Sequence, residues 1–262
     1  DILGRKQNTL PDTYGRELAP ENYAARSYRG GEFSLNWNDR IGEVSYGISA
    51  NMGYAKDKWD IYDEEPAYAA GGAQNFRSRV GRPENRIVGL EAIDLVRTQE
   101  QLDALKSKGF KTYGRDPYLG MILYKDQRGV NYSDGPDGKI DGNDMVLLSD
   151  NNTPRINYGF GLNGSWKGIS VSALFQGVLA YDRIISNLDG PGIRQHGGGF
   201  RPYYPIWADD VWTAENPGAK YPRVVGANWA ESGTEASSFW IRNGAYLRLR
   251  DLNVSYSLPL AL

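Results

Sequence analysis

Apolar and polar residues alternate with a period of two along two neighbouring stretches of this chain. In residues 156–166, apolar and aromatic side chains alternate with glycine, asparagine and serine. Residues 169–181 repeat the pattern after a short turn around Lys167. A period of two puts successive side chains on opposite faces of a β-strand. The two stretches therefore predict a long antiparallel hairpin.

Two further regions show the same alternation. Phe33, Leu35 and Trp37 alternate with small polar residues, and after a predicted turn at 38–41 the chain returns through 44–54. A last strand is predicted over 246–258, where the apolar phase slips near Arg250 and Asp251 and so predicts a β-bulge. Residues 5–30 are polar and irregular, and they predict a loop.

The polar phase of these strands is unusual because it consists of glycine, serine, asparagine and glutamine instead of lysine and glutamate. A sheet face in bulk water normally carries charged residues, so small neutral residues favour a face enclosed in a wet lumen. Strands of roughly 9–11 residues are also long enough to cross a bilayer when tilted. The sequence therefore predicts an all-β fold, a transmembrane antiparallel β-barrel with long extracellular loops.

The connections divide the chain into wall and loops. Outer-membrane barrels keep short turns on the periplasmic side and long loops outside. If both short turns are periplasmic, residues 57–155 and 182–244 form two extracellular excursions. Within the first, we expect a short strand at 87–90, an extended segment at 118–124, and a helix that begins at Thr98 with a capping box to Gln101.

The composition argues against several kinds of partner and site. Lys and Arg number 30 and Asp and Glu number 32, so the charge indicates no nucleic-acid partner. The chain lacks cysteine, which excludes disulfides and thiolate metal sites. It has no apolar run near the roughly 18 residues of a membrane helix, and it starts without a secretory signal peptide. We expect a fragment of a longer protein.

An acidic turn at 134–144 is the candidate metal site. Hard oxygen ligands spaced around a glycine turn can hold Ca²⁺, and here they are Asp134, Asp137, Asp141 and Asp144. The pattern resembles a calcium loop, but Ser133 and Gly135 stand where two further ligands are expected. A metal-free, Asx-rich turn is therefore the favoured interpretation, with calcium as the alternative. No cofactor is required by this reading.

No catalytic residue is predicted. His196 is the only histidine, and no nucleophile pattern accompanies it, so the sequence gives no support for a catalytic triad. Residues 159–164 fit G-x-G-x-x-G but lie inside a predicted strand, whereas a dinucleotide site needs them between a strand and a helix. Loop carboxylates are plentiful, and no spacing singles out a glycosidase pair.

Aromatic residues concentrate in the second excursion. Their rings could stack on sugars or on peptide side chains, which makes them the candidate substrate-binding residues: Tyr203, Tyr204, Trp207, Trp212, Trp229 and Trp240. Packing of the loops and an interfacial aromatic girdle explain the same residues at least as well. The sequence leaves these interpretations open.

The motifs along the chain resemble one family. Their order is that of SusC/RagA-type TonB-dependent transporters: VGRP (80–83), 89–105, DGKIDGND (137–144), PRINYG (154–159), FQG (175–177), VWTAENP (211–217), YPR (221–223) and IRNGAYLRLRDL (241–252). Each motif alone is weak evidence for the family. Together the motifs cover most of the chain, and their combined order is specific.

The resemblance implies the C-terminal part of a plugged barrel of about 22 strands, with the plug domain and the last strands absent from this chain. It implies a multi-pass protein of the bacterial outer membrane that imports nutrients, oligosaccharides first and peptides second. It also implies a SusD-like surface lipoprotein as partner, the TonB–ExbB–ExbD complex acting through the missing N-terminal part, and outer-membrane lipid around the wall. No bond chemistry is expected.

Two other classes of protein remain as alternatives. A soluble, secreted β-sandwich could bind carbohydrate through the aromatic residues at 200–240. A surface hydrolase would have to turn over a glycan or a peptide, which we do not expect. A need for detergent separates the transporter from the sandwich.

Overall fold

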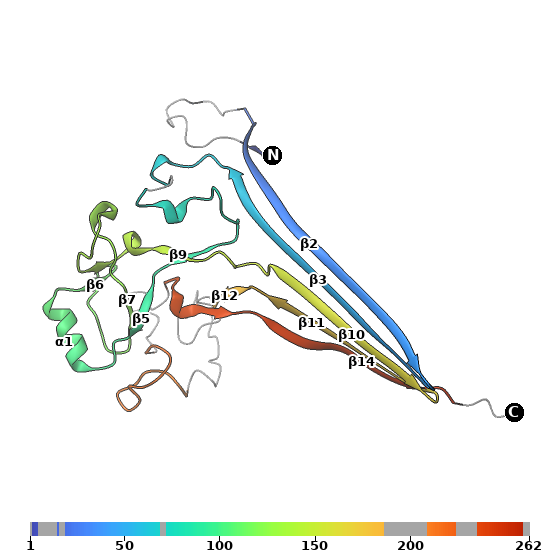
Figure 1. The fold of residues 1–262 in the computed structure, drawn as a ribbon. Helices are drawn as coiled ribbons and strands as arrows, with labels where there is room; N and C mark the ends of the chain where they lie inside the picture. The colour runs from blue at the N-terminus through green and yellow to red at the C-terminus, as the bar shows by residue number, and fades with distance from the viewer. Residues whose placement is uncertain are drawn as a thin grey trace.

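The computed structural model describes residues 2–4, 15, 19–68, 72–185, 209–223 and 235–258. Its main feature is one antiparallel sheet of six strands in the order β1-β2-β3-β10-β11-β14 (Figure 1). The strands are β1 (Ile2–Gly4), β2 (Glu21–Ile41), β3 (Val44–Ile61), β10 (Ile156–Trp166), β11 (Ile169–Leu179) and β14 (Tyr246–Tyr256). The predicted antiparallel all-β class is confirmed. The sheet is open, with β1 and β14 at its edges, so a closed barrel stays a prediction.

The β10–β11 hairpin has the predicted turn. Trp166 pairs with Ile169, and the two turn residues Lys167 and Gly168 both have positive φ, 45° and 82°. Positive φ at both positions is typical of a type I′ turn, whose twist matches that of the flanking strands. The turn is therefore the tightest connection that two long antiparallel strands can have.

The first hairpin corrects two predictions. Its turn lies at Gly42 and Glu43, not at 38–41, because Ile41 pairs with Val44 and the polar residues before it continue the strand. Gly42 supplies the positive φ, 61°. The predicted loop at 5–30 is wrong for 21–30, which belong to β2. Residues 25–30 pair with the equally polar outer half of β3, and residues 21–24 pair with β1. Residues 5–14 and 16–18 lie outside the described residues.

The predicted bulge in the last strand is confirmed. Asp251 pairs with Leu174, but Leu249 pairs with the next residue, Phe175, so that Arg250 is the extra residue. A bulge reverses the phase of the strand. The two leucine sets of this strand, which the sequence places in opposite phases, therefore lie on the same face of the sheet.

Smaller elements connect the long strands. The helix α1 (Gln99–Ser107) has the predicted capping box, because Gln101 N donates to Thr98 Oγ1 at 3.3 Å and Thr98 N donates to Gln101 Oε1 at 3.2 Å. The predicted strand at 87–90 is present as β4. The extended segment predicted at 118–124 is a strand only at 122–124, as β7, because Leu119 and Gly120 form a turn. The short strands pair as β4 (Ile87–Gly89) with β9 (Val146–Ser149), β5 (Ala92–Leu95) with β7 (Ile122–Tyr124), β6 (Lys111–Thr112) with β8 (Lys139–Ile140), and β12 (Asp182–Ile184) with β13 (Ile241–Asn243).

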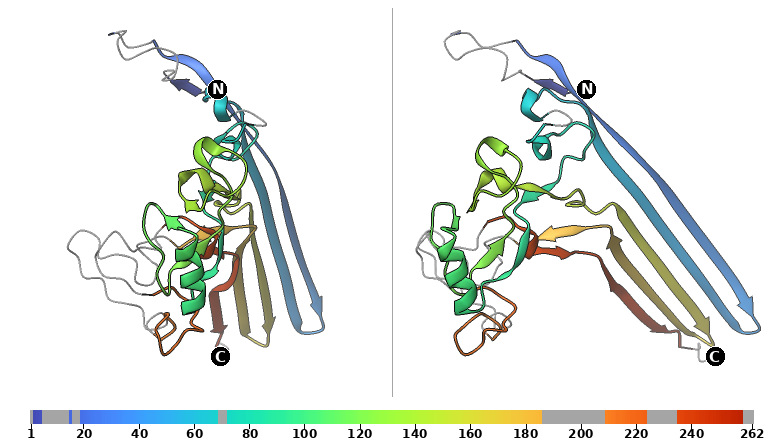
Figure 2. Two further views of the ribbon diagram at one scale, coloured as in Figure 1. Left: turned by 90° about the vertical axis from the view of Figure 1, so that its left-hand side faces the viewer. Right: turned by 60° about the vertical axis from the view of Figure 1, so that its left-hand side comes forward.

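These elements form a unit, here called the loop domain, that comprises the described residues of 62–155 and 182–245. Its core joins residues from both excursions, among them Leu90, Leu95, Ile122, Ile140 and Trp240. A bridge between Leu90 and Ser237 links the two excursions through the backbone. The loop domain lies at one end of the sheet, and both short turns lie at the opposite end (Figures 1 and 2).

No helix among the described residues is long and apolar enough to cross a membrane.

Candidate functional site

The sheet has two chemically different faces, which the register assigns residue by residue. Leu162 pairs with Ile48 and Ala173, whereas its neighbour Asn163 pairs with Gly47 and Ser172. Directly paired residues share a face, and neighbours along a strand alternate. We call the two surfaces the apolar face and the polar face.

The apolar face is exposed along its length. Trp37, Phe33 and Val254 are 57%, 55% and 65% exposed, and further exposed residues follow the same phase: Leu35, Ile48, Met52, Leu162, Val171, Leu249, Leu252 and Tyr256. The other sheets of the described residues have two strands each, so none can cover this face as the second layer of a β-sandwich. A continuous apolar surface of this size is not stable in water, and it matches the lipid-facing side of a barrel wall.

Between the short turns and the level of Gly53 and Asn157, the polar face is uncharged on its three central strands. Over this span the inward positions of β3, β10 and β11 are Ser45, Gly47, Ser49, Asn51, Gly53, Asn157, Gly159, Gly161, Asn163, Ser165, Ser170, Ser172, Leu174, Gln176 and Val178. Apart from Leu174 and Val178, they offer amides, hydroxyls or bare backbone. Charged side chains occur on the flanking strands, as Arg40 on β2 and Asp251 on β14. This surface can hydrogen-bond a polar, neutral molecule in many orientations.

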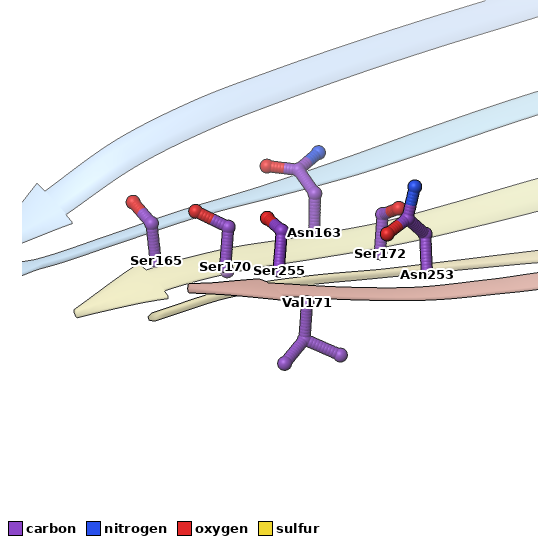
Figure 3. Close-up of a pocket in the computed structure, with 8 residues that line it drawn as sticks. Asn163, Ser165, Ser170, Val171, Ser172, Asn253 and Ser255 are labelled. Atoms are coloured by element: carbon purple, nitrogen blue, oxygen red, sulfur yellow. The ribbon is translucent and has the colours of Figure 1, made fainter. Parts of the chain in front are cut away.

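A shallow groove of about 310 Å³ lies on the polar face near the short turns. Figure 3 shows the side chains of Asn163, Ser172 and Asn253 on the same side of the sheet, with Val171 pointing to the opposite side. Ser165, Ser170 and Ser255 complete the row of hydroxyls. The groove therefore presents only neutral hydrogen-bonding groups.

Glycine keeps part of this surface flat. A Cβ at Gly47 would contact Asn38 Oδ1 and would lie 2.7 Å from Asn163 Nδ2, and a Cβ at Gly161 would lie 2.6 Å from Ser49 Oγ. The amides of Asn38 and Asn163 thus converge over Gly47 from the strands on either side. At Gly47 and Gly161 glycine is therefore required by the neighbouring side chains, not by backbone conformation.

The candidate substrate-binding aromatics divide into two groups. Trp212 and Trp240 are buried in the core of the loop domain, at 7% and 1% exposure, so they pack the loops and present no surface for a ligand. Tyr203, Tyr204, Trp207 and Trp229, like His196, lie outside the described residues. Substrate binding by these four aromatics stays a prediction.

The acidic turn uses its carboxylates to bind its own backbone. Asp144 is fully buried and accepts hydrogen bonds from the N–H groups of Gln127, Arg128 and Asp141 at 2.8, 3.0 and 2.9 Å. Asp126 accepts from the N–H groups of residues 137 and 138 at 3.2 and 2.7 Å. These bonds fold residues 126–144 into a compact turn without any further ligand.

The other candidate ligands point to separate partners. Asp137 and Asp141 each accept from a backbone N–H two residues further on, and Asp134 forms an ion pair with Arg128 at 3.4 Å. Among the residues that the structure describes, no group of three or more His, Cys, Asp or Glu side chains is arranged to hold a metal ion. Calcium binding at Asp134, Asp137, Asp141 and Asp144 therefore stays a prediction without a preformed cage.

Burial shifts the pKa of three ionisable side chains in the loop domain. Burial raises the pKa of Tyr113 and Tyr124 above that of an ordinary phenol, and the nearby carboxylate of Glu235 raises both further. Burial also raises the pKa of Asp126, although two backbone N–H donors oppose the shift. Both tyrosines therefore stay neutral at physiological pH and act as packing residues of the core.

The two faces, the strand length and the short turns at one end define a class of structure, a segment of transmembrane β-barrel wall carrying a folded loop domain at the other end. Solved structures show the same fold. The structure of the RagAB peptide transporter matches with a TM-score of 0.62 and 18% identity over 97% of this chain and 25% of the matched chain. The "open-open" state of the RagAB peptide importer matches with a TM-score of 0.58 and 18% identity over 99% of this chain and 25% of the matched chain.

A sequence relative supports the same class. TonB-dependent receptor P26 of Formosa agariphila is 27% identical over 96% of this chain, which spans 24% of that protein's length. No protein-family model matches the chain. The resemblance to SusC/RagA-type TonB-dependent transporters, predicted from the motif order, is thereby confirmed.

Sequence reasoning missed the loop domain as a folded unit. Arg97 donates to the carbonyl oxygens of Pro217 and Ala219 at 2.8 and 2.7 Å, joining segments about 120 residues apart. Gly120 lies against Trp212 and Arg223, leaving no room for a Cβ. The buried apolar residues of both excursions were the available signal, but their short, irregular spacing has no period from which a shared core can be read.

Proposed function

We propose that the longer protein imports nutrients across the bacterial outer membrane in a TonB-dependent manner, and that this chain supplies part of its barrel wall and an outer loop domain. The observation that carries the proposal is the sheet with one exposed apolar face and one uncharged polar face. Such a sheet separates lipid from a wet lumen. The relative named as a TonB-dependent receptor supports the energy source.

The orientation follows from the two ends of the sheet. Both two-residue turns lie at one end, where Lys167 of the second turn forms an ion pair with Glu43 of the first at 3.3 Å. We place this end in the periplasm because short turns lie there in outer-membrane barrels. The loop domain is then extracellular, and so are the predicted excursions 57–155 and 182–244, which contain most of it. There it would contact a SusD-like lipoprotein, while TonB–ExbB–ExbD would act through parts of the protein outside this chain.

The cargo we propose is an oligosaccharide first and a peptide second. Hydroxyl-rich sugars suit a lumen wall whose central strands carry amides and hydroxyls and no charge between the short turns and Gly53. The RagAB structures, described as those of a peptide transporter, support the second choice. The transporter performs no bond chemistry. Calcium at the acidic turn would stabilise the loop domain and would take no part in transport.

Uptake by whole cells tests the proposal. A strain lacking the full-length gene, with and without a plasmid copy, is given a labelled neutral oligosaccharide or a labelled peptide, each with and without a protonophore. We expect the plasmid copy to restore uptake of one cargo, and the protonophore to abolish it because TonB depends on the proton gradient of the inner membrane. Equal uptake in all strains would contradict the proposed function.

A further inference from the structure

Three basic residues occupy the outward side of β2 and β3 just beyond the apolar band. Arg29 pairs with Lys56, and Ser27 pairs with Lys58. These pairs continue the phase of Gly31 with Tyr54, without a bulge between them. All three cations therefore lie on the apolar face, at the end of the sheet that carries the loop domain.

The apolar band ends where a membrane would end. From Val44 to Tyr54, β3 covers about ten residues, or roughly 33 Å along the strand. A strand tilt of about 40° converts this length into a height of about 25 Å, the usual height of the apolar belt of a barrel. Lys56 lies one outward position beyond Tyr54, and Lys58 lies two positions beyond it. The cations are thus at the level of lipid headgroups.

Positive charge is in excess on this outward surface. Arg29 and Lys56 are exposed. Within the described part of the chain, the carboxylate that faces this group is Asp60, 2.9 Å from Lys58 and also in electrostatic interaction with Arg29. On the inward side of the same strands, Arg26 and Asp57 form a partly buried ion pair at 2.5 Å. The chain thus compensates its charge toward the lumen and leaves about two cations uncompensated toward the membrane.

The inward side is also covered, whereas the outward side is open. Glu84 N donates to Asp57 Oδ2 at 2.9 Å, and Trp59 Nε1 donates to Glu84 Oε2 at 2.6 Å. The segment that follows β3 therefore folds over the inward side. The basic side chains of the opposite side stay accessible to a partner that approaches through the plane of the membrane.

We propose that Arg29, Lys56 and Lys58 form a binding site for the phosphate groups of anionic lipids in the outer leaflet. Guanidinium and ammonium groups pair well with phosphate oxygens, and clustered cations at a membrane surface bind anionic headgroups additively. The site anchors the outer rim of the wall to the leaflet that surrounds it. This inference rests on the membrane placement in the proposed function, and it does not depend on which cargo is transported.

Native mass spectrometry of the full-length protein in a neutral detergent tests the site. Dioleoylphosphatidylglycerol and, in parallel, dioleoylphosphatidylcholine are titrated against the wild type and against the triple variant Arg29→Gln, Lys56→Gln, Lys58→Gln. We expect the wild type to prefer the anionic lipid and the triple variant, which loses about two uncompensated cations, to need about thirtyfold more of it for equal occupancy. Equal binding by the wild type and the triple variant would overturn the site.

A matched variant removes the same charge elsewhere. Lys106→Gln, Lys108→Gln and Lys139→Gln lie in the loop domain and should leave lipid binding unchanged; an equal loss there would show a general charge effect and overturn the proposal. If the outward triple variant does not fold, Lys56→Gln alone should weaken binding by about fivefold. A wild type that stays monodisperse without detergent would contradict the membrane placement itself, an outcome separate from loss of the lipid site.

Discussion

At the residue scale, neighbouring side chains along one strand lie on opposite faces of the sheet, one apolar and one polar. Ile48 and Ser49 are neighbours on β3, yet the first shares a face with Leu162 and the second with Gly161. Val171 and Ser172 are separated in the same way on β11. Each such pair is an internal control, because the two residues share depth, strand and local backbone.

An arginine scan of these pairs tests which face meets lipid. Ile48→Arg should destabilise the full-length protein by roughly 2–4 kcal/mol, because a cation would enter the apolar belt near its middle. Val171→Arg should cost less, because Val171 lies level with Tyr46 near the turn end of the belt. Ser49→Arg and Ser172→Arg should cost much less in a wet lumen. Unfolding in lipid vesicles measures the difference, and equal costs on both faces would contradict the barrel wall.

Gly47 offers a second test at this scale. Gly47→Val should cost about 1–3 kcal/mol, because the new side chain would displace the amides of Asn38 and Asn163 that converge over it. Gly53→Val is the control, since a Cβ there meets Glu32 Cγ only at 4.0 Å. The same unfolding assay applies, and a Gly47 variant as stable as the Gly53 variant would show that the contact is not restrictive.

At the element scale, two local devices set the geometry. The bulge at Arg250 brings Leu247 and Leu249 onto the face of Leu252, so one inserted residue restores a continuous apolar surface. The acidic turn is organised by Asp144, whose carboxylate gathers three backbone N–H groups from two separate segments. The bulge and the acidic turn both depend on hydrogen bonds of the backbone. The residues around them can therefore vary without a regular pattern.

The acidic turn makes a testable prediction. Asp144→Asn should destabilise the loop domain by about 1–3 kcal/mol, because an amide supplies one acceptor atom where the carboxylate supplies two, and it places N–H groups against an N–H donor. Asp134→Asn should have little effect, since its side chain is fully exposed. Hydrogen exchange over 126–144 measures both variants. A chelator should leave the wild type unchanged, and loss of protection on chelation would instead show bound calcium.

At the scale of the whole molecule, the loop domain combines two distant excursions around one core. Its closure above the sheet brings Trp240 and Ser237 against Leu90, although about 146 residues separate Ala92 from its partner Ser238. A unit assembled this way holds both excursions in one arrangement, which a binding surface for a partner requires. The six-stranded sheet has open edges at β1 and β14, and unpaired strand edges are unfavourable in lipid.

Arg97 tests the coupling of the two excursions. Arg97→Ala removes the donors to the carbonyl oxygens of Pro217 and Ala219, and it should increase proteolysis of residues 209–223 several-fold while leaving the sheet intact. Lys125→Ala is the control, because it removes an exposed ion pair with Glu91 inside one excursion. Unchanged cleavage in the Arg97 variant would show that other contacts suffice to join the excursions.

Much of the wall could be predicted from local pattern. Alternation with a period of two determined the hairpin at 156–179, its turn, the bulge near Arg250 and the identity of the two faces, because a strand sorts its side chains by nearest neighbours alone. The capping box at Thr98 was equally local. Each of these features depends on residues that lie within about ten positions of one another in the sequence.

Only the tertiary structure decided the rest. The outer half of β2 reads as a loop until its polar residues meet β3, and the turn at Gly42 is set by that pairing. The sequence leaves Trp212 and Trp240 open between ligand binding and loop packing, and only the joining of the two excursions buries them in one core. The basic group of Arg29, Lys56 and Lys58 exists only in the register of two strands. Each of these depends on contacts between segments far apart in the chain, which alternation along one strand does not encode.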